Sequence, residues 1–223
     1  MNMSCVSAFV GLLASTLSLC AMPARGCDLA LLLAIDVSGS VDDAEYRLQI
    51  DGTADALQDP EVRDALVHGQ VALAVVQWSA VEMQRLVIPW QTIDTAADVA
   101  RLAPLVRAQE RAFGKADTAV ADALSFAAAQ FDTAPDCNRR VIDISGDGVQ
   151  NSGASLPEAR RNIAGQGIVI NAIAIEGMGV AISEFYRRAV ITRGGFVQTA
   201  RGHLEYPKAI RAKLLREIVV PMG

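Results

Sequence analysis

The chain lacks an excess of positive charge: 20 Lys and Arg residues stand against 25 Asp and Glu residues, for a net charge of −5. Nucleic-acid-binding proteins usually carry a basic patch, so the composition argues against such a partner. The sequence has only two histidines, His68 and His203. Neither lies at the carboxyl end of a predicted strand, which argues against a Ser-His-Asp hydrolase.

Repeats, low-complexity tracts and linkers are also absent, and 223 residues suit one medium domain. One long apolar run is present, Val6–Ala21, and small residues follow it at Ala24 and Gly26. This pattern predicts a signal peptide over residues 1–26, cleaved after Ala24 or Gly26. No Lys or Arg precedes the run, and an uncleaved membrane anchor is the alternative. We therefore expect a secreted or periplasmic protein whose folded domain covers residues 27–223.

From Cys27 onward, short β-rich runs alternate with helical stretches, a pattern typical of a parallel α/β sheet with helices on both faces. Strands are expected at 29–35, 71–78, 83–88, 140–145, 168–175 and 195–199. Helices are expected at 43–57, 61–67, 94–109 and 118–131, from 157 onward, at 181–190 and at 203–218. Only a short turn joins the second and third strands, which suits an antiparallel hairpin.

The segment after the first strand carries three oxygen-bearing side chains at alternate positions. Asp36, Ser38 and Ser40 follow the apolar run 29–35, in the motif Asp-Val-Ser-Gly-Ser. A carboxylate and two hydroxyls so closely spaced form a compact oxygen cluster. Hard divalent cations such as Mg²⁺ prefer oxygen ligands, so this cluster predicts half of a metal site.

Two later segments supply candidates for the other half. Asp147 lies between two glycines at the end of the β-rich run that begins at Ile142. Thr118 follows the loop Gly114–Asp117 and precedes a helix-like stretch. In this order, the three segments resemble the metal-ion-dependent adhesion site (MIDAS) of von Willebrand factor A (vWA) domains.

The resemblance extends beyond the candidate ligands. Val75–Ser79 is similar to the second strand of the family, which ends in an aromatic residue and a serine. Ala123 and Leu124 stand where the family places a small residue and an apolar residue after its metal-binding threonine. The resemblance implies a doubly wound, mostly parallel six-stranded sheet of order 3-2-1-4-5-6, in which strand 3 is antiparallel.

The resemblance also implies a mechanism. Ser38, Ser40 and Thr118 would give hydroxyl ligands, while Asp36 and Asp147 would bind directly or through water. Mg²⁺ is the expected ion, with Mn²⁺ or Ca²⁺ as alternatives. Because hydroxyls are neutral, the ion stays electrophilic toward an acidic group of a protein partner. The implied function is an exported, non-enzymatic binding module.

Each part of this pattern has a structural alternative. Ser40 and Thr118 are also suitable helix caps, and Asp147 lies in a common Asp-Gly turn. Asp117, beside the loop threonine, is either a helix-start charge or an outer partner of the metal site. Asp143, inside the fourth strand, needs a buried partner such as an arginine.

The cysteines are placed consistently with this arrangement. Cys27 lies nine residues before Asp36, and Cys137 lies ten residues before Asp147. If the two aspartates meet at the carboxyl ends of adjacent parallel strands, as the resemblance implies, then the cysteines lie together at the opposite ends. A disulfide is then expected in an oxidising compartment, and two buried free thiols are the alternative.

Two other functions compete with the binding module. A metal-dependent, phosphatase-like hydrolase is suggested by Asp36 after a strand and by the glycine-flanked Asp147. That chemistry needs a second aspartate where the chain has Ser38, and Lys115 is the only nearby lysine available to balance charge. The other competitor is a structural secreted domain whose metal site is vestigial.

Overall fold

The computed structural model describes residues 27–177 and 181–219, so the predicted signal peptide lies outside the described residues. One six-stranded sheet has the order β3-β2-β1-β4-β5-β6. In chain order the strands are β1 (Cys27–Asp36), β2 (Ala72–Trp78), β3 (Gln84–Thr92), β4 (Cys137–Gly146), β5 (Ile168–Ile175) and β6 (Val197–Ala200). All neighbouring strands are parallel except β2 and β3. The predicted strand order and the antiparallel third strand are confirmed.

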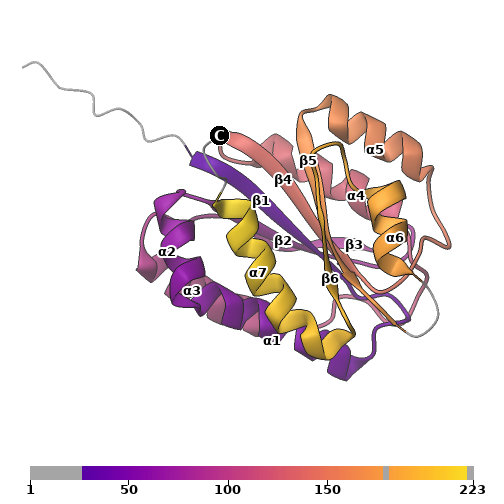
Figure 1. Ribbon diagram of the computed structural model, residues 1–223, viewed down its shortest axis with the longest axis horizontal. Helices are drawn as coiled ribbons and strands as arrows, with labels where there is room; N and C mark the ends of the chain where they lie inside the picture. The colour runs from indigo at the N-terminus through magenta and orange to yellow at the C-terminus, as the bar shows by residue number, and fades with distance from the viewer. Residues whose placement is uncertain (1–26, 178–180, 220–223) are drawn as a thin grey trace, which may run out of the picture.

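Helices cover both faces of the sheet. The α-helices are α1 (Asp43–Gln58), α2 (Pro60–His68), α3 (Ala96–Arg107), α4 (Val120–Ala129), α5 (Leu156–Gly165), α6 (Ile182–Phe185) and α7 (Tyr206–Ile218). Shorter helical turns are η1 (Gln130–Thr133), η2 (Tyr186–Val190) and η3 (His203–Glu205). Helices α1, α2, α3 and α7 pack on one face, and α4, α5 and α6 on the other (Figure 1). None of the helices in the described part of the chain has the length and apolar character needed to cross a membrane.

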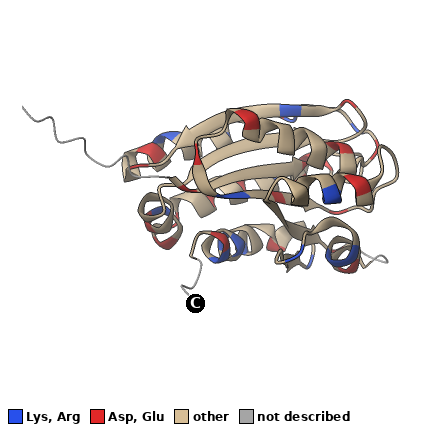
Figure 2. Cartoon of the chain, turned by 90° about the horizontal axis from the view of Figure 1, so that it is seen from above, with Lys and Arg blue, Asp and Glu red and all other residues tan. Residues whose placement is uncertain are grey.

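Strand β1 shows why the sheet lies between two helical layers. Leu29, Leu31 and Leu33 belong to the core on the α1 side, whereas Ala30 and Leu32 belong to the core on the α4 side. A strand that is apolar at successive positions can bury both faces, which is typical of parallel sheets. Acidic and basic residues lie mainly on the surrounding helices and loops (Figure 2).

The predicted element ends differ from the structure where local signals are weak. Strand β3 continues through Pro89 to Thr92 instead of ending at Ile88. Proline is tolerated there because β3 is an edge strand, with no neighbour on its outer side. The helix expected from Thr118 begins at Val120, and the helix expected from His203 is divided into η3 and α7.

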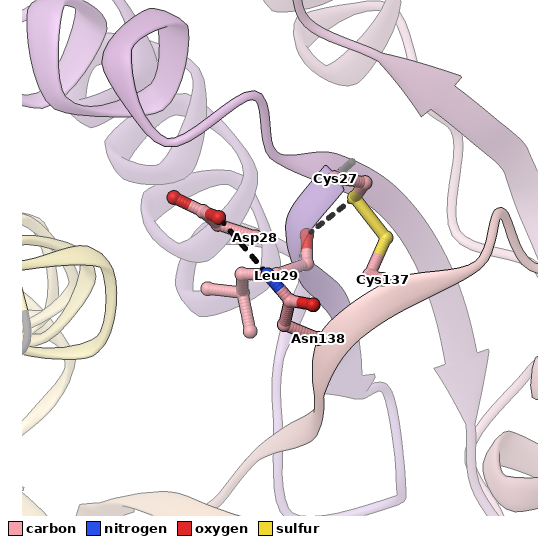
Figure 3. Close-up of a disulfide and its surroundings, with 5 residues drawn as sticks. All are labelled: Cys27, Asp28, Leu29, Cys137 and Asn138. Carbon is pink, nitrogen blue, oxygen red and sulfur yellow. Dashed lines mark hydrogen bonds between the residues drawn. A yellow bond between two sulfur atoms is a disulfide. The ribbon is translucent and has the colours of Figure 1, made fainter. Parts of the chain in front are cut away.

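The disulfide between Cys27 and Cys137 is present, which confirms that prediction (Figure 3). The two residues are register partners at the amino-terminal ends of β1 and β4, with their Cα atoms 4.4 Å apart. Beside the bridge, the Asn138 side-chain amide donates a hydrogen bond to Asp28 at 3.3 Å. The bridge therefore fastens the end of the sheet opposite the predicted metal site.

Asp143 is buried in β4 and has a buried partner, as expected, which is a lysine. The Lys213 ammonium, on α7, lies 2.6 Å from Asp143 Oδ1 and is also paired with Glu217. Asn171 of β5 donates a hydrogen bond to Glu217 at 2.9 Å. Burial raises the pKa of Asp143, and the neighbouring charge of Glu217 raises it further. This buried charge cluster joins α7 to the centre of the sheet.

Candidate metal centre

The loop between β1 and α1 holds the first three predicted ligands. Asp36 and Ser38 are buried, and Ser40 is exposed. Asp36 Oδ1 accepts a hydrogen bond from the Ser38 backbone N–H at 2.7 Å, which curls the chain at the end of the strand. As a result, the Oγ atoms of Ser38 and Ser40 lie only 3.2 Å apart.

Asp147, after β4, meets this loop. The Ser40 hydroxyl donates a hydrogen bond to Asp147 Oδ1 at 2.5 Å, although 107 positions separate the two residues. Thr118 lies beside them: a Cβ atom placed on Gly148 would be 3.5 Å from Thr118 Oγ1 and 3.8 Å from Ser40 Oγ. The structure therefore brings side chains from all three predicted segments to one edge of the sheet. Their role as metal ligands stays a prediction.

Backbone contacts hold the three loops together. The Gly39 N–H donates to the carbonyl of Ala116 at 2.7 Å, which links the first loop to the loop that carries Thr118. Asn151, beyond Asp147, accepts from the Thr118 N–H at 2.9 Å through its side chain. Its own N–H donates to the Thr118 carbonyl at 3.1 Å. Asn151 thus fixes the position of Thr118 from both sides.

The helix-cap alternatives are not supported. Helix α1 is capped by Asp42, which forms a reciprocal capping box with Glu45, so Ser40 has no capping role. Helix α4 begins after Ala119 without a side-chain cap, so the Thr118 hydroxyl is not used there either. Neither hydroxyl caps a helix, and the Ser40 hydroxyl instead contacts Ser38 and Asp147.

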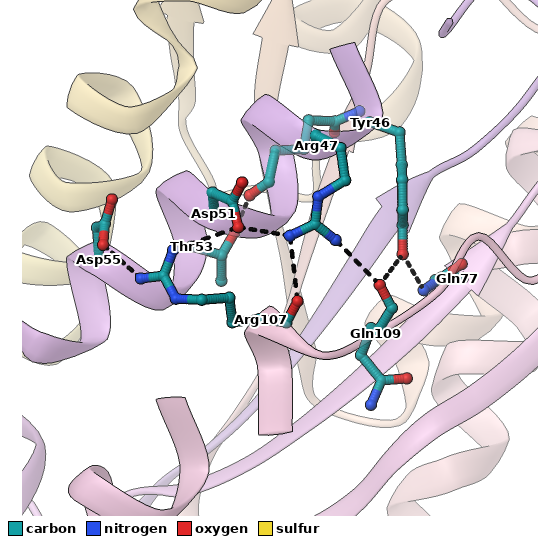
Figure 4. A network of polar contacts seen from close by, with 9 residues as sticks. Tyr46, Arg47, Asp51, Thr53, Asp55, Gln77, Arg107 and Gln109 are labelled. Carbon is teal, nitrogen blue, oxygen red and sulfur yellow. Dashed lines mark hydrogen bonds and ion pairs between the residues drawn. The ribbon is translucent and has the colours of Figure 1, made fainter. Parts of the chain in front are cut away.

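A polar network behind the site holds the segment that leads to Thr118. Gln77 of β2 donates hydrogen bonds to Tyr46 Oη at 3.0 Å and to the Glu110 carbonyl at 3.1 Å. Tyr46 in turn donates to the Gln109 carbonyl, as does Arg47 (Figure 4). Because Gln77 and Tyr46 are buried, these contacts fix the path of the chain after α3.

Arg111 clamps the first loop from outside the oxygen cluster. Its guanidinium donates to the backbone carbonyls of Val37 and Ser38, each at 2.8 Å, and forms an ion pair with Asp43 at 3.0 Å. These hydrogen bonds involve only the backbone carbonyls of the loop. The arginine therefore stabilises the loop conformation without occupying the serine hydroxyls.

Asp36 has one carboxylate oxygen with no partner. Its Oδ2 is buried and makes no hydrogen bond with any residue in the described ranges. Burial raises the pKa of Asp36 to about 7, and the charge of Asp147 adds to the increase. A buried, unpaired carboxylate oxygen is costly unless a proton or a cation satisfies it. The donor set of carboxylates and hydroxyls therefore fits a hard divalent cation.

The Tyr186 hydroxyl and Asp36 both lie close to Gly146, at the end of β4. A Cβ atom on Gly146 would lie 2.3 Å from Tyr186 Oη and 2.9 Å from Asp36 Oδ2, so only glycine fits there. Burial, followed by the charges of Asp36 and Asp147, holds the pKa of Tyr186 well above its usual value. The phenol therefore stays protonated, and its Oη makes no hydrogen bond with any of the described residues. Tyr186 lies within η2, and no sequence pattern marks it.

His203 also reaches the site, contrary to the expectation that neither histidine lies near a carboxyl strand end. It begins η3, directly after β6, and its Nε2 lies 3.9 Å from Asp147 Oδ2. Its Nδ1 lies 3.0 Å from Glu45 Oε1. The signal that was available is its position in the loop after a parallel strand, where ligands of α/β sheets commonly bind.

The pKa of Asp36 predicts a specific pH dependence in the absence of divalent cations. Its folded-state pKa of about 7 exceeds the ordinary value of 3.8, so the folded state binds the proton more tightly than the unfolded state. The contribution of Asp36 to stability should therefore fall as pH rises from about 4 to about 7, and then level off. Denaturant unfolding in chelator, compared between wild type and Asp36→Asn, isolates this contribution. A difference between the two proteins that does not vary over this pH range would contradict it.

Residues 26–222 match the model of a family described as "Protein of unknown function (DUF1194)". A search of curated proteins finds no match. Solved structures that share the fold include a vWA protein from Catenulispora acidiphila, with 21% identity and a TM-score of 0.62 over 86% of this chain.

Two further structures extend the comparison. Proximal thread matrix protein 1 from the mussel byssus, solved with a zinc-occupied MIDAS motif, has 19% identity and a TM-score of 0.62 over 86% of this chain. The present chain covers 48% of that protein and 43% of the Catenulispora protein. The conserved hypothetical protein BatB from Bacteroides thetaiotaomicron has 15% identity and a TM-score of 0.57, with 85% of this chain and 98% of that chain covered. The chain therefore has the vWA fold.

Proposed function

We propose that this chain, which belongs to the DUF1194 family, is an exported, non-enzymatic binding module that works through a divalent cation. Asp36, Ser38, Ser40, Thr118 and Asp147 would hold Mg²⁺, Mn²⁺ or Ca²⁺. When bound, the cation would supply a coordination position for a carboxylate of a protein partner. The observation that carries the proposal is the buried Oδ2 of Asp36, which has no hydrogen-bond partner among the described residues, in the carboxylate whose Oδ1 accepts from the Ser38 N–H.

The accessibility of the cluster supports a binding role. Ser38 and Asp36 are buried and form the floor, while Ser40 is exposed and Asp147 is partly exposed. A cation held from below by buried oxygens would face solvent on the outer side. An acidic group from a partner can approach from that side without rearrangement of the sheet. The zinc-occupied MIDAS of the mussel protein supports cation binding by this fold.

Export is supported by two features of the chain. The predicted signal peptide over residues 1–26 would direct secretion, and the Cys27–Cys137 bridge is typical of oxidising compartments. We therefore assign the module to the periplasm or the extracellular space.

Divalent cations should raise the melting temperature of the protein. At a concentration about 100 times the Kd, binding to the folded state alone stabilises it by about 2.7 kcal/mol. For a domain of this size, the shift is about 5–10 °C. Ser38→Ala should lose most of the shift, because it removes a buried ligand oxygen. Differential scanning calorimetry with Mg²⁺, Mn²⁺ and Ca²⁺ measures the effect.

A matched control separates ligand loss from general destabilisation. Ser125→Ala removes a serine hydroxyl that bonds the Ala121 carbonyl within α4, so its cation-induced shift should equal that of wild type. An equal shift in Ser38→Ala and wild type would contradict the proposed ligands. The immobilised wild type should also retain a protein partner from the secreted or periplasmic fraction in Mg²⁺ and release it in chelator. Ser38→Ala should not retain that partner.

A further inference from the structure

His203 presents an unpaired nitrogen to the acidic edge of the candidate metal centre. The side chain is 8% exposed. Its Nδ1 lies 3.0 Å from Glu45 Oε1, and its Nε2 lies 3.9 Å from Asp147 Oδ2. Nε2 is buried and has no hydrogen-bond partner among residues 27–177 and 181–219. Burying a ring nitrogen without a hydrogen-bond partner costs free energy, and a bound cation would remove that cost.

The contact with Glu45 places a carboxylate oxygen 3.0 Å from Nδ1 and leaves Nε2 to face Asp147. With a proton on Nδ1 alone, Nε2 carries a lone pair. Nε2 and Asp147 Oδ2 are then two acceptors that face each other across 3.9 Å, too far apart for a hydrogen bond. Zinc–nitrogen and zinc–oxygen bonds are about 2 Å long, so two ligand atoms at a tetrahedral angle lie about 3.3 Å apart. The two atoms, which lie 3.9 Å apart, therefore need to approach by about 0.6 Å to bind one zinc ion.

We propose that Glu45, Asp147 and His203 form a second cation site, for a borderline transition-metal ion such as Zn²⁺. His203 Nε2 and Asp147 Oδ2 are its ligands, and Glu45 orients the imidazole through Nδ1. One nitrogen or oxygen atom from each of these three side chains lies within 4.8 Å of the other two. A carboxylate that accepts from the far nitrogen of a metal-binding histidine is a recurrent feature of zinc sites.

The two sites select different ions. The cluster of Ser38, Ser40 and Thr118 offers oxygen, which suits Mg²⁺, Mn²⁺ and Ca²⁺, whereas imidazole suits Zn²⁺, Cu²⁺ and Ni²⁺. Asp147 belongs to both sites: Oδ1 accepts from Ser40, and Oδ2 faces His203. Each ion must therefore change the affinity of the other by the same factor, because the coupling is reciprocal. The second site goes beyond the proposed function and does not depend on it.

Calorimetric titration with Zn²⁺, in the presence of saturating Mg²⁺, tests the site on the full chain. Wild type should bind one equivalent of Zn²⁺, and His203→Gln should bind it at least about tenfold more weakly. Glu45→Gln should also weaken binding, although glutamine preserves the capping box of α1. His68→Gln is the matched control, because His68 is the other histidine of the chain and is exposed at the end of α2; its Zn²⁺ affinity should be unchanged.

A second measurement keeps the test independent of how the variants fold. Nuclear magnetic resonance of wild type with paramagnetic Co²⁺ should shift or broaden the ring signals of His203 and leave those of His68 unaffected. Equal Zn²⁺ affinity in His203→Gln and wild type, or unaffected His203 signals, would overturn the second site. Ser38→Ala should lose the Mg²⁺ response and keep Zn²⁺ binding, so failure of the proposed function is distinguishable from failure of this site.

Discussion

Replacing Lys213 with methionine is expected to lower the free energy of unfolding by about 3–5 kcal/mol, because the change leaves two buried carboxylates without their counter-ion. Lys213 is fully buried between Asp143 and Glu217. Methionine has a similar length and fills the same space, so the loss comes from charge rather than from a cavity. Urea unfolding at neutral pH measures it.

Two further variants test the electrostatic origin of this loss. Lys208→Met, at an exposed position on the same helix, should change stability by no more than about 0.5 kcal/mol. Adding Asp143→Asn and Glu217→Gln to Lys213→Met should recover much of the lost stability, since a neutral cluster has no unpaired charge. If the triple variant is as unstable as Lys213→Met alone, the charge explanation is wrong.

Reduction of the Cys27–Cys137 bridge is expected to have the second large effect. The bridge closes a loop with a sequence separation of 110 residues. On the chain-entropy account, a loop of this size contributes about 4–5 kcal/mol, and measured losses for native bridges are about 2–5 kcal/mol. We expect the reduced protein to unfold at a correspondingly lower denaturant concentration. The bridge lies at the end of the sheet opposite the metal centre, so cation binding by the folded protein should survive reduction.

The double variant Cys27→Ala/Cys137→Ala provides the reference for this experiment. It should match the reduced wild type in stability and should not respond to reductant. If reductant destabilises the double variant as much as wild type, the effect arises elsewhere in the chain.

Much of the fold could be predicted because its signals are local. The apolar run 29–35 marks a strand buried on both faces, and the helices expected at 43–57 and 61–67 are present as α1 and α2. The strand order is a long-range property, and it followed from the resemblance to vWA domains rather than from periodicity. Strand β3 runs past its predicted end at Ile88, because an edge strand tolerates Pro89 and the edge position depends on the long-range strand order.

The candidate site also has residues that the sequence predicts and residues that it does not. Asp36, Ser38 and Ser40 stand together in the sequence, so their cluster could be recognised at once. Tyr186 and His203 approach the site only through the packing of η2 and η3 against the sheet, and neither belongs to a recognisable motif. Side chains that meet only in the folded state leave no pattern of spacing to detect.

The most direct test of the metal centre is an anomalous diffraction measurement on crystals grown with Mn²⁺. The account predicts a peak within bonding distance of the hydroxyl oxygens of Ser38, Ser40 and Thr118, with Asp36 and Asp147 bound to the ion directly or through water. The peak should be absent from crystals of Ser38→Ala. Full Mn²⁺ occupancy elsewhere in the protein, with no peak among these oxygens, would contradict the account.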